Sequence, residues 1–287
     1  MPELPEVETM RRGIAPVVGC RIQSAERLPC PRKPILLKPA LAALRRRVAG
    51  RRIERTDRAG KRVVLWLDSG DALVFEPRMT GLVLLDDPPD ALYCRLRLSL
   101  RGGKARQLLY WDRRGLGRVA LLTRAQFDDH YGPHALGPDA LTMTGPMYCE
   151  RLGGSQRAVK VALLDQRAVA GIGNLYASEI LFTAGIHPAL PCRRMTRRQW
   201  DALAETAVAV LETAIRYEGS TLSDGTYRNA LNRAGGYQNE HRVYDKAGAP
   251  CPRAECRGVV ARIVQSQRST FFCSRCQRLS RRPVAGR

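Results

Sequence analysis

The chain begins Met1-Pro2-Glu3-Leu4-Pro5-Glu6-Val7-Glu8-Thr9. Removal of Met1 would leave a secondary amine at the terminus, beside the carboxylate of Glu3. A secondary amine that attacks the aldehyde carbon of a sugar forms an iminium, which is cationic without a proton and therefore withdraws electrons. An α-amino group has an unperturbed pKa of ~8 against ~10.4 for lysine, so more of it is neutral at pH 7. The alternative is structural, because a proline in the first turn and nearby acidic residues are typical of a helix start.

The charge of the chain indicates a polyanionic partner. Its 287 residues include 48 Lys and Arg against 27 Asp and Glu, a formal net charge of +21. An excess of this size, most of it arginine, favours nucleic acid over a small substrate. The length suits two or three domains. No apolar run approaches the ~20 residues of a membrane span, and the acidic start is not typical of a signal peptide.

The nine cysteines indicate a metal site rather than disulfides, because the chain shows no secretion signal. Four of them form the pattern C-x4-C, sixteen residues, C-x2-C: Cys251, Cys256, Cys273 and Cys276. Four thiolates at this spacing predict one structural Zn²⁺ in a closed tetrahedral site without an open catalytic position. Residues 259–264 and 270–272 predict the strands of a hairpin, with residues 267–269 at its tip.

The other five cysteines lie among apolar neighbours and are predicted to be small buried residues. They are Cys20, Cys30, Cys94, Cys149 and Cys192.

The hydrophobic period divides the rest of the chain. Residues 20–122 contain short β-type runs, and residues 96–100 alternate strictly between apolar and polar side chains. A helix is predicted around residues 39–48. From about residue 124 the pattern becomes helical, with one helix over residues 175–184 and another that begins at Thr196, a suitable N-cap. Residues 219–241 are rich in Gly, Ser, Thr and Asn without a period, which predicts a mobile loop.

Three motifs together resemble the formamidopyrimidine-DNA glycosylase family, which includes the 8-oxoguanine enzymes and the endonuclease VIII branch. They are the start quoted above, the run Gly171-Ile172-Gly173-Asn174-Leu175-Tyr176-Ala177-Ser178-Glu179, and the run Gln267-Arg268-Ser269-Thr270-Phe271-Phe272-Cys273. They follow the family's order over nearly the whole chain. The start and the later run Gly185-Ile186-His187-Pro188 look closer to the formamidopyrimidine branch.

The patterns and the resemblance together predict an α+β fold in three domains. Residues 1–130 are expected to form an N-terminal antiparallel β-sandwich, or flattened barrel, with two flanking helices. Residues 131–242 are expected to form a helical domain that contains the family's helix–two-turns–helix element. Residues 243–287 would form the zinc hairpin and a basic tail.

The resemblance also implies roles for single residues. Pro2 matches the nucleophile, and Glu3 matches the residue that moves protons during base loss and elimination. Lys61 and Arg268 match two cations that hold the phosphates beside the lesion, so we place them in the catalytic set. The further acidic position of the first helix, Glu6, is placed with the DNA-binding residues. Asn174 matches an asparagine that contacts the DNA backbone, as amide groups at a helix start favour phosphate.

An enzyme that acts on a base within a duplex must extrude that base and then fill the gap. The resemblance assigns the filling to Met79, Arg114 and Leu116. Leu116 departs from the usual aromatic residue, whose stacking is worth ~1–3 kcal/mol per base. The alternative for Met79 is an ordinary core residue, and for Leu116 a buried strand residue.

Two further departures leave lesion preference and opposite-base discrimination open. Glu76-Pro77-Arg78 replaces a commoner His-Leu-Gly, and Ala91-Leu92-Tyr93-Cys94 replaces a His-rich turn that touches phosphate.

The predicted function is a bifunctional DNA glycosylase/AP lyase of base excision repair that excises 8-oxoguanine and formamidopyrimidine. The predicted cofactor is one structural Zn²⁺, with no nucleotide cofactor, and the predicted partner is damaged double-stranded DNA bound by a monomer. We expect a cytoplasmic, nucleoid-associated protein of bacterial type without a membrane partner. One alternative is an endonuclease VIII-like enzyme for oxidised pyrimidines or abasic sites. Another is a non-catalytic zinc-containing damaged-DNA-binding protein, against which the combination of Pro2, Glu3 and Lys61 speaks.

Overall fold

A computed structural model describes residues 2–221, 227–229 and 233–279 of the chain. The chain divides into two compact units. The first comprises residues 1–135 and 214–238, and the second comprises residues 136–213 and 239–287. None of the helices in the described ranges is long and apolar enough to cross a membrane.

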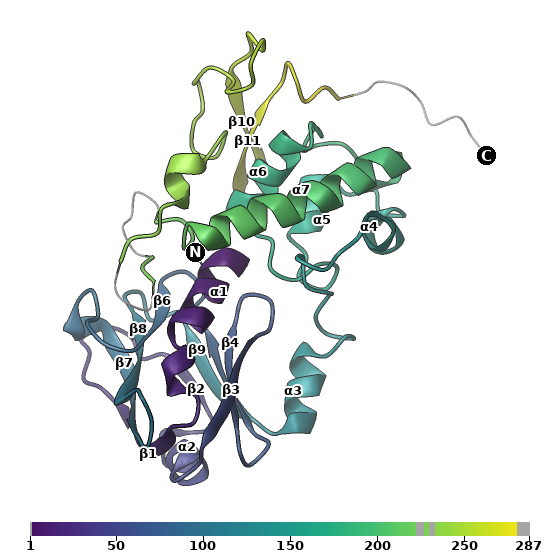
Figure 1. Ribbon diagram of the computed structural model, residues 1–287. Helices are drawn as coiled ribbons and strands as arrows, with labels where there is room; N and C mark the ends of the chain where they lie inside the picture. Colours follow the sequence, from purple (N-terminus) through teal and green to yellow (C-terminus); the bar gives the residue numbers. More distant parts are fainter. Residues whose placement is uncertain (1, 222–226, 230–232, 280–287) are drawn as a thin grey trace. The chain divides into compact units, whose positions relative to one another are not determined.

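The first unit is a β-sandwich of two sheets (Figure 1). The four-stranded sheet has the order β1 (Arg21–Arg27), β7 (Cys94–Arg101), β8 (Gln107–Asp112) and β6 (Gly81–Leu84). The five-stranded sheet has the order β2 (Leu36–Lys38), β9 (Arg118–Leu122), β5 (Ala72–Glu76), β4 (Val63–Leu67) and β3 (Ile53–Arg58). Neighbouring strands are antiparallel except β2 and β9, a short parallel pair that the sequence patterns did not reveal.

The buried faces of the strands follow the predicted alternation where one face is wet. In β7, Leu96, Leu98 and Leu100 are buried, whereas Arg97 and Ser99 are half-buried. The strand β4 is buried along its whole length because it lies between β5 and β3 and both of its faces are covered. Val63, Leu65 and Leu67 face the core, whereas Trp66 packs against Phe127 with 4.8 Å between ring centroids. The predicted β-sandwich is confirmed.

Among the described residues, three α-helices lie wholly in this unit: α1 (Leu4–Gly13), α2 (Leu41–Val48) and α3 (Arg124–Tyr131). The predicted helix around residues 39–48 corresponds to α2, which buries Leu44 and Val48 against β1. The helix α3 begins at a capping box between Thr123 and Gln126. The short 3₁₀ turns of the chain lie at Ala15–Val17, Ala91–Tyr93, Cys192–Arg194 and Tyr237–Glu240.

The second unit holds the helices α4 (Gly145–Leu152), α5 (Val159–Leu163) and α6 (Asn174–Thr183), and most of α7 (Arg197–Arg216). The predicted helix over residues 175–184 is confirmed as α6, which begins and ends one residue earlier than predicted. Thr196 caps α7 as expected, because its hydroxyl accepts from the Gln199 N–H at 3.3 Å. One face of α7 is buried, with Trp200 and Leu203 almost fully enclosed.

The C-terminal hairpin consists of β10 (Val260–Gln265) and β11 (Arg268–Cys273). Its turn is formed by Ser266 and Gln267, both with positive φ (46° and 60°), as a two-residue hairpin turn with right-handed strand twist requires. The predicted tip is therefore corrected by one position. Gln267 lies at the tip, whereas Arg268 and Ser269 are the first residues of β11 and Arg268 pairs with Gln265.

The expectation that all five remaining cysteines are buried needs correction. Cys20, Cys94 and Cys192 are buried as predicted, but Cys30 is half-buried and Cys149 is exposed. Cys149 faces outward because α4 turns the neighbouring Tyr148 toward the core.

Several described residues of the segment 219–241 are packed. Ser220 and Tyr227 are buried, and the Tyr237 N–H donates to the Gly219 carbonyl at 3.0 Å. These contacts anchor the segment at several points, and its mobility stays a prediction. Residues 222–226 and 230–232 of that segment lie outside the described residues.

Candidate active site and zinc centre

The N-terminus of α1 is fixed by two carboxylates. Glu3 is the N-cap and forms a reciprocal capping box with Glu6, and the Glu3 backbone N–H donates to Glu6 Oε2 at 2.8 Å. Both side chains are buried, with exposed fractions of 4% and 2%. The residue predicted as nucleophile, Pro2, is buried and directly precedes this cap. The start of the chain therefore has a defined position relative to a carboxylate one residue away.

Glu6 also holds the segment that follows α7. Its Oε1 accepts from the Ser220 N–H at 2.9 Å, and its backbone carbonyl accepts from the Tyr227 hydroxyl at 3.4 Å. Burial raises the pKa of Tyr227 well above its usual value, with the Glu6 carboxylate as a further cause, so the hydroxyl stays a donor. Gly219 has a φ of +80°, and a Cβ there would lie 2.9 Å from Glu6 Cγ. Glycine is therefore required where this segment passes the helix.

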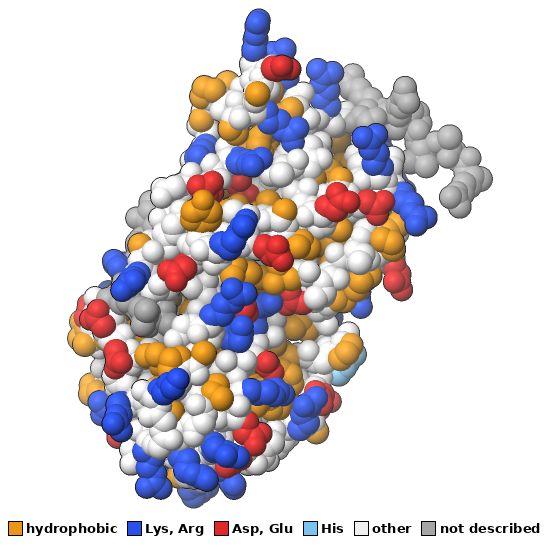
Figure 2. Space-filling view, viewed as in Figure 1, with side chains coloured by type: hydrophobic (Ala, Val, Ile, Leu, Met, Phe, Trp, Pro, Cys, Tyr) orange, Lys and Arg blue, Asp and Glu red, His pale blue; other side chains and the backbone are white. Residues whose placement is uncertain are grey.

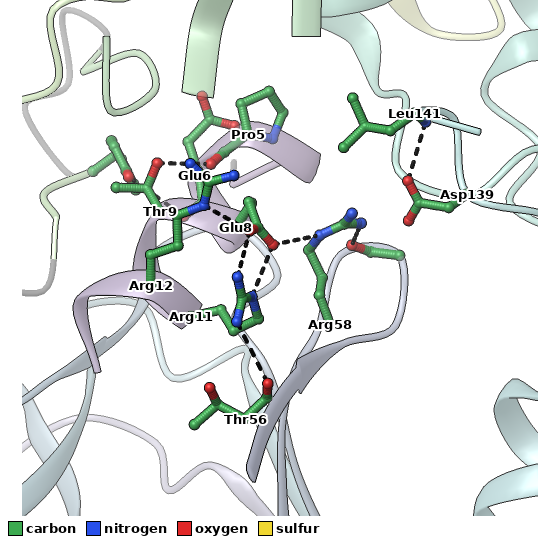
Figure 3. A network of polar contacts seen from close by, with 12 residues as sticks. Pro5, Glu6, Glu8, Thr9, Arg11, Arg12, Thr56, Arg58, Asp139 and Leu141 are labelled. Atoms are coloured by element: carbon green, nitrogen blue, oxygen red, sulfur yellow. Dashed lines mark hydrogen bonds and ion pairs between the residues drawn. The ribbon is translucent and has the colours of Figure 1, made fainter. Parts of the chain in front are cut away.

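Glu8 lies two residues after Glu6 in α1 and ties this helix to the hairpin between β3 and β4 (Figure 3). Its carboxylate accepts from Arg11 at 2.7 Å, Arg12 at 2.8 Å and Arg58 at 3.2 Å. Arg58 in turn donates to the Gly60 carbonyl at 3.1 Å. Burial would raise the pKa of Glu8, but hydrogen bonds from Arg11 and Arg12 outweigh it and lower that pKa to about 2. Glu8 therefore connects the helix that starts at Pro2 with the hairpin that carries Lys61.

The three predicted void-filling residues lie in two loops of the first unit. Met79 is in the turn between β5 and β6, and Arg114 and Leu116 are in the loop between β8 and β9. The side chains of Met79 and Leu116 are exposed, at 39% and 44%, and Arg114 is exposed as well. The alternative that Met79 or Leu116 is a buried residue is therefore wrong.

In the second unit, the side-chain amide of Asn174 is held at both ends. Its Oδ1 accepts from Lys160 Nζ at 2.7 Å, and its Nδ2 donates to the Ser269 carbonyl at 2.9 Å. Lys160 has an exposed fraction of 0%. The second amide hydrogen of Asn174 is a donor that could bind a phosphate. Ser269 follows Arg268, whose side chain is exposed, so this pair of contacts joins the start of α6 to the zinc hairpin.

Glu179 joins α6 to the segment before the zinc hairpin. Its carboxylate accepts from the backbone N–H groups of Arg242, Val243 and Tyr244 at 2.7–3.0 Å. Burial raises the pKa of Glu179, although the three backbone donors act in the opposite direction.

The four cysteines predicted to bind zinc lie together in the described structure. The ligand sulfurs are all within 4.8 Å of one another. The Cys251 and Cys276 sulfurs are 3.7 Å apart, and those of Cys256 and Cys273 are 3.8 Å apart. A tetrahedron with Zn–S bonds of ~2.3 Å has S–S edges of about 3.8 Å. The donor set therefore fits one structural Zn²⁺ that closes the base of the hairpin.

The described structure groups the predicted site residues by unit. Pro2, Glu3, Glu6, Lys61 and the void-filling residues lie in the first unit, and Asn174, Arg268 and the four cysteines lie in the second.

Positive charge extends beyond these residues. Figure 2 shows Lys and Arg side chains gathered over α2 and the adjoining end of the sandwich. The exposed members there include Arg45, Arg46, Arg51 and Arg52. A cationic surface of this kind is typical of a protein that binds a polyanion.

Three family models match successive parts of the chain. Residues 1–119 match the formamidopyrimidine-DNA glycosylase N-terminal domain, residues 135–226 match the formamidopyrimidine-DNA glycosylase H2TH domain, and residues 248–279 match a zinc finger found in FPG and IleRS. The chain is 44% identical to a formamidopyrimidine-DNA glycosylase of Chloroflexus aggregans, over 96% of this chain and 98% of the relative. The chain belongs to the formamidopyrimidine-DNA glycosylase family. It is a base excision repair enzyme with DNA glycosylase and AP lyase activities.

Solved structures of this family share the whole fold. The MutM (FPG) protein of Thermus thermophilus is 37% identical, with a TM-score of 0.82, over 96% of this chain and 98% of that one. An FPG mutant of Lactococcus lactis, solved with a Fapy-dG-containing DNA, is 30% identical with a TM-score of 0.84, over 97% and 100% of the two chains. The family assignment, the fold and the four-cysteine zinc finger predicted from the sequence are thus confirmed.

Sequence reasoning missed several residues that organise the site. Lys160 could have been noticed as a lone cation within the apolar run of residues 159–164, since a buried lysine needs a partner. Glu8 gave no such signal, because acidic residues in the first turns of a helix are common and Arg58 lies 50 positions away.

The Glu8 cluster generates a prediction on stability. Replacing Glu8 by Gln removes the charge that holds Arg58, so we expect a loss of about 1–2 kcal/mol in the free energy of unfolding at pH 7, after allowance for solvent screening. The pKa of Glu8 in the folded protein, about 2, lies below the ordinary 4.5. Its contribution is therefore complete above pH 4.5 and disappears as the pH falls through 2. Urea unfolding of both proteins across this range measures it.

Glu26→Gln is the matched control, because Glu26 also pairs with an arginine but lies at the surface. Glu26→Gln should produce a smaller loss in the free energy of unfolding at pH 7. A difference in the free energy of unfolding between the natural protein and Glu8→Gln that stays constant from pH 7 to pH 2 would contradict the stabilising role of the Glu8 carboxylate.

The zinc centre generates a second prediction. The purified protein should contain one zinc per chain, and Cys273→Ser should lose the metal and the binding of damaged DNA while the β-sandwich stays folded. Metal analysis measures the zinc content, a DNA-binding assay measures the binding of damaged DNA, and circular dichroism measures the folding of the β-sandwich. Cys149→Ser is the control, since this thiol is exposed and distant in sequence from the cluster. Fully active protein with almost no metal would rule out the zinc site.

Proposed function

We propose that this chain removes oxidised purines, 8-oxoguanine and formamidopyrimidine, from double-stranded DNA and that Pro2 is the nucleophile. The observation that carries the proposal is the buried capping box at the start of α1. It fixes both the backbone and the carboxylate of Glu3, the residue that directly follows Pro2, whose amine the removal of Met1 would expose. Covalent catalysis requires a nucleophile and a proton-transfer group that are fixed relative to each other. The capping box supports this requirement, because it restrains the Glu3 residue that follows Pro2.

The reaction uses Pro2 and Glu3 in sequence. The Pro2 nitrogen forms a bond to C1′ as the glycosidic bond breaks, and the base takes up a proton as it leaves. The amine then loses its proton, O4′ gains one as the sugar ring opens, and an iminium joins Pro2 to C1′. The iminium acidifies the C2′ protons, so that elimination breaks the C3′–O bond and a second elimination breaks the C5′–O bond. Glu3 exchanges these protons with the substrate.

The remaining residues bind the DNA. Lys61 and Arg268 hold phosphates beside the lesion, and Asn174, at the start of α6, contributes its side-chain amide to the DNA backbone. Met79, Arg114 and Leu116 fill the gap that the extruded nucleotide leaves. The exposure of Met79 and Leu116 supports this assignment. One chain carries the complete set of predicted residues, which supports a monomer as the active species.

A preference for oxidised pyrimidines is the second candidate function. A wild-type FPG of Lactococcus lactis, 30% identical to this chain, was solved with DNA that contains an oxidised pyrimidine. The aliphatic Leu116 and the Glu76-Pro77-Arg78 turn of this chain also depart from the usual family pattern, which leaves room for a different lesion.

The nucleophile assignment predicts a clear separation of variants. Pro2→Gly, and a variant that retains Met1, should lose both strand cleavage and the covalent complex that borohydride forms by reducing the iminium. Glu3→Gln should bind DNA normally but excise the base more slowly by about 10² or more, the usual scale for a lost acid or base. Single-turnover kinetics and gel analysis measure these effects. Undiminished trapping in either Pro2 variant would contradict the assignment.

The lesion assignment predicts the order of substrates. Purified enzyme should cleave duplexes that carry 8-oxoguanine or formamidopyrimidine faster than a matched duplex that carries thymine glycol, with an abasic duplex as the reference for the lyase step. Single-turnover rates on the four duplexes, with cytosine opposite the purine lesions, measure the preference. Faster removal of thymine glycol would establish the second candidate in place of the first.

A further inference from the structure

Asp112, at the end of β8, connects the two loops that carry the proposed void-filling residues. Its side chain has an exposed fraction of 0%. One oxygen accepts from the Thr80 hydroxyl and from the Arg114 N–H at 3.2 Å, and the other accepts from the Gly117 N–H at 2.7 Å. Thr80 directly follows Met79, and Gly117 directly follows Leu116. A single buried carboxylate therefore binds the hydroxyl of the residue after Met79, the backbone N–H of Arg114 and the backbone N–H of the residue after Leu116.

Arg95, which is also buried, binds the backbone at the start of the loop that carries Arg114 and Leu116. Its Nε donates to the Asp112 carbonyl at 2.7 Å and its Nη1 donates to the Lys33 carbonyl at 3.3 Å. Gly115 has a φ of +67°, and a side chain there would collide with the same Lys33 carbonyl. The backbone of this loop is thus tightly packed, whereas the side chains of Arg114 and Leu116 are exposed.

A second carboxylate, Glu76, ties the Met79 turn to the hairpin that carries Lys61. It pairs with Arg78 Nε at 2.7 Å and with Arg62 Nε at 3.3 Å. Its backbone carbonyl accepts from the Tyr110 hydroxyl at 3.0 Å. Arg78 has a φ of 54°, an uncommon value for a side chain other than glycine, so the turn needs such restraints.

Both carboxylates carry a charge that repels DNA phosphates, and both lie beside loops proposed to touch DNA. A negative charge in this position lowers the affinity for DNA, so a structural role is needed to offset this cost. The contacts above supply that role, because each carboxylate joins two segments that are remote in sequence.

We propose that Asp112 and Glu76 are positioning residues that hold the Met79 turn, the Arg114–Leu116 loop and the Lys61 hairpin rigidly to one another. The void-filling side chains then enter the duplex together, in a fixed relation to the phosphate beside the lesion. Preorganisation of this kind avoids the entropy of ordering two separate loops on binding. The inference rests on the proposed function and adds to it the residues that couple void filling to the phosphate grip.

The test compares substrates that do and do not require a filled gap. Asp112→Asn keeps the shape, but it places an amide N–H₂ against backbone donors. It should slow excision of 8-oxoguanine from a duplex by about tenfold, which is the scale expected for a small misplacement of binding groups. Cleavage of a single-stranded abasic oligonucleotide, which has no opposite strand and no gap to fill, should change by less than about twofold.

Coupling through the loops is tested by combining substitutions. If Asp112 acts through Leu116, Asp112→Asn should cost about tenfold in the natural background but only about twofold when Leu116 is already Ala, because coupled residues are not additive. Glu76→Gln should show the same pattern with Met79→Ala at a smaller amplitude. Asp86→Asn is the matched control, because Asp86 accepts a hydrogen bond in the same sheet but is exposed and remote from both loops.

Several outcomes would overturn the inference. These are unchanged excision by folded Asp112→Asn, an equal loss on the single-stranded substrate, or an equal cost in the Leu116→Ala background. If Asp112→Asn fails to fold, Thr80→Val decides, because it removes only the hydroxyl that joins the two loops and should slow duplex excision by about threefold. Inactivity of the natural enzyme on every abasic substrate would instead refute the proposed function.

Discussion

The capping box at the N-terminus of α1 makes the proposed chemistry possible. A terminal amine is the most mobile group of most chains, and it can act as a nucleophile only when the chain end is held. Here Glu3 and Glu6 satisfy each other's backbone donors, and Glu6 further binds the Ser220 N–H more than two hundred positions away. The hydrogen bonds that begin the helix are therefore the same ones that would aim the reactive nitrogen.

Buried and half-buried carboxylates organise the arginine-rich first unit in a common way. Glu8 joins α1 to the Lys61 hairpin, Glu76 joins that hairpin to the Met79 turn, and Asp112 joins the turn to the Leu116 loop. Glu8 and Glu76 do so by pairing with arginines, whereas Asp112 binds a hydroxyl and two backbone N–H groups. Each contact restrains a loop from its inner side, so the outer side remains cationic and open to phosphate. The acidic residues are few, but they fix the arrangement of the basic ones.

Features set by local spacing could be predicted from the sequence. The zinc site follows from cysteine spacing, because chelation and a tight hairpin restrict the intervening length. The helix that begins at Asn174 and the capped start of α7 follow from turn and cap residues. The β-sandwich follows from alternating strands. The sandwich, the helical elements and the family were thus accessible before the structure.

Features set by long-range contacts could not be predicted. The β2–β9 pair is too short to show a period, and the exposure of Cys149 depends on which face of α4 meets the core. In the sequence, Asp112 is an ordinary polar residue at the end of a strand. Its role becomes visible only when the fold brings the Thr80 hydroxyl to its carboxylate. Lys160 and Asn174 are 14 positions apart, with two glycines between them, and only the folded second unit shows that they are hydrogen-bonded.

The most direct measurement is to locate the covalent bond to DNA. The enzyme is incubated with an abasic duplex and borohydride, digested with trypsin, and its peptides are analysed by mass spectrometry. We expect the deoxyribose remnant on the amino group of Pro2, in the peptide of residues 2–11. A remnant on Lys61 or another lysine, with the N-terminal peptide unmodified, would contradict the role of Pro2.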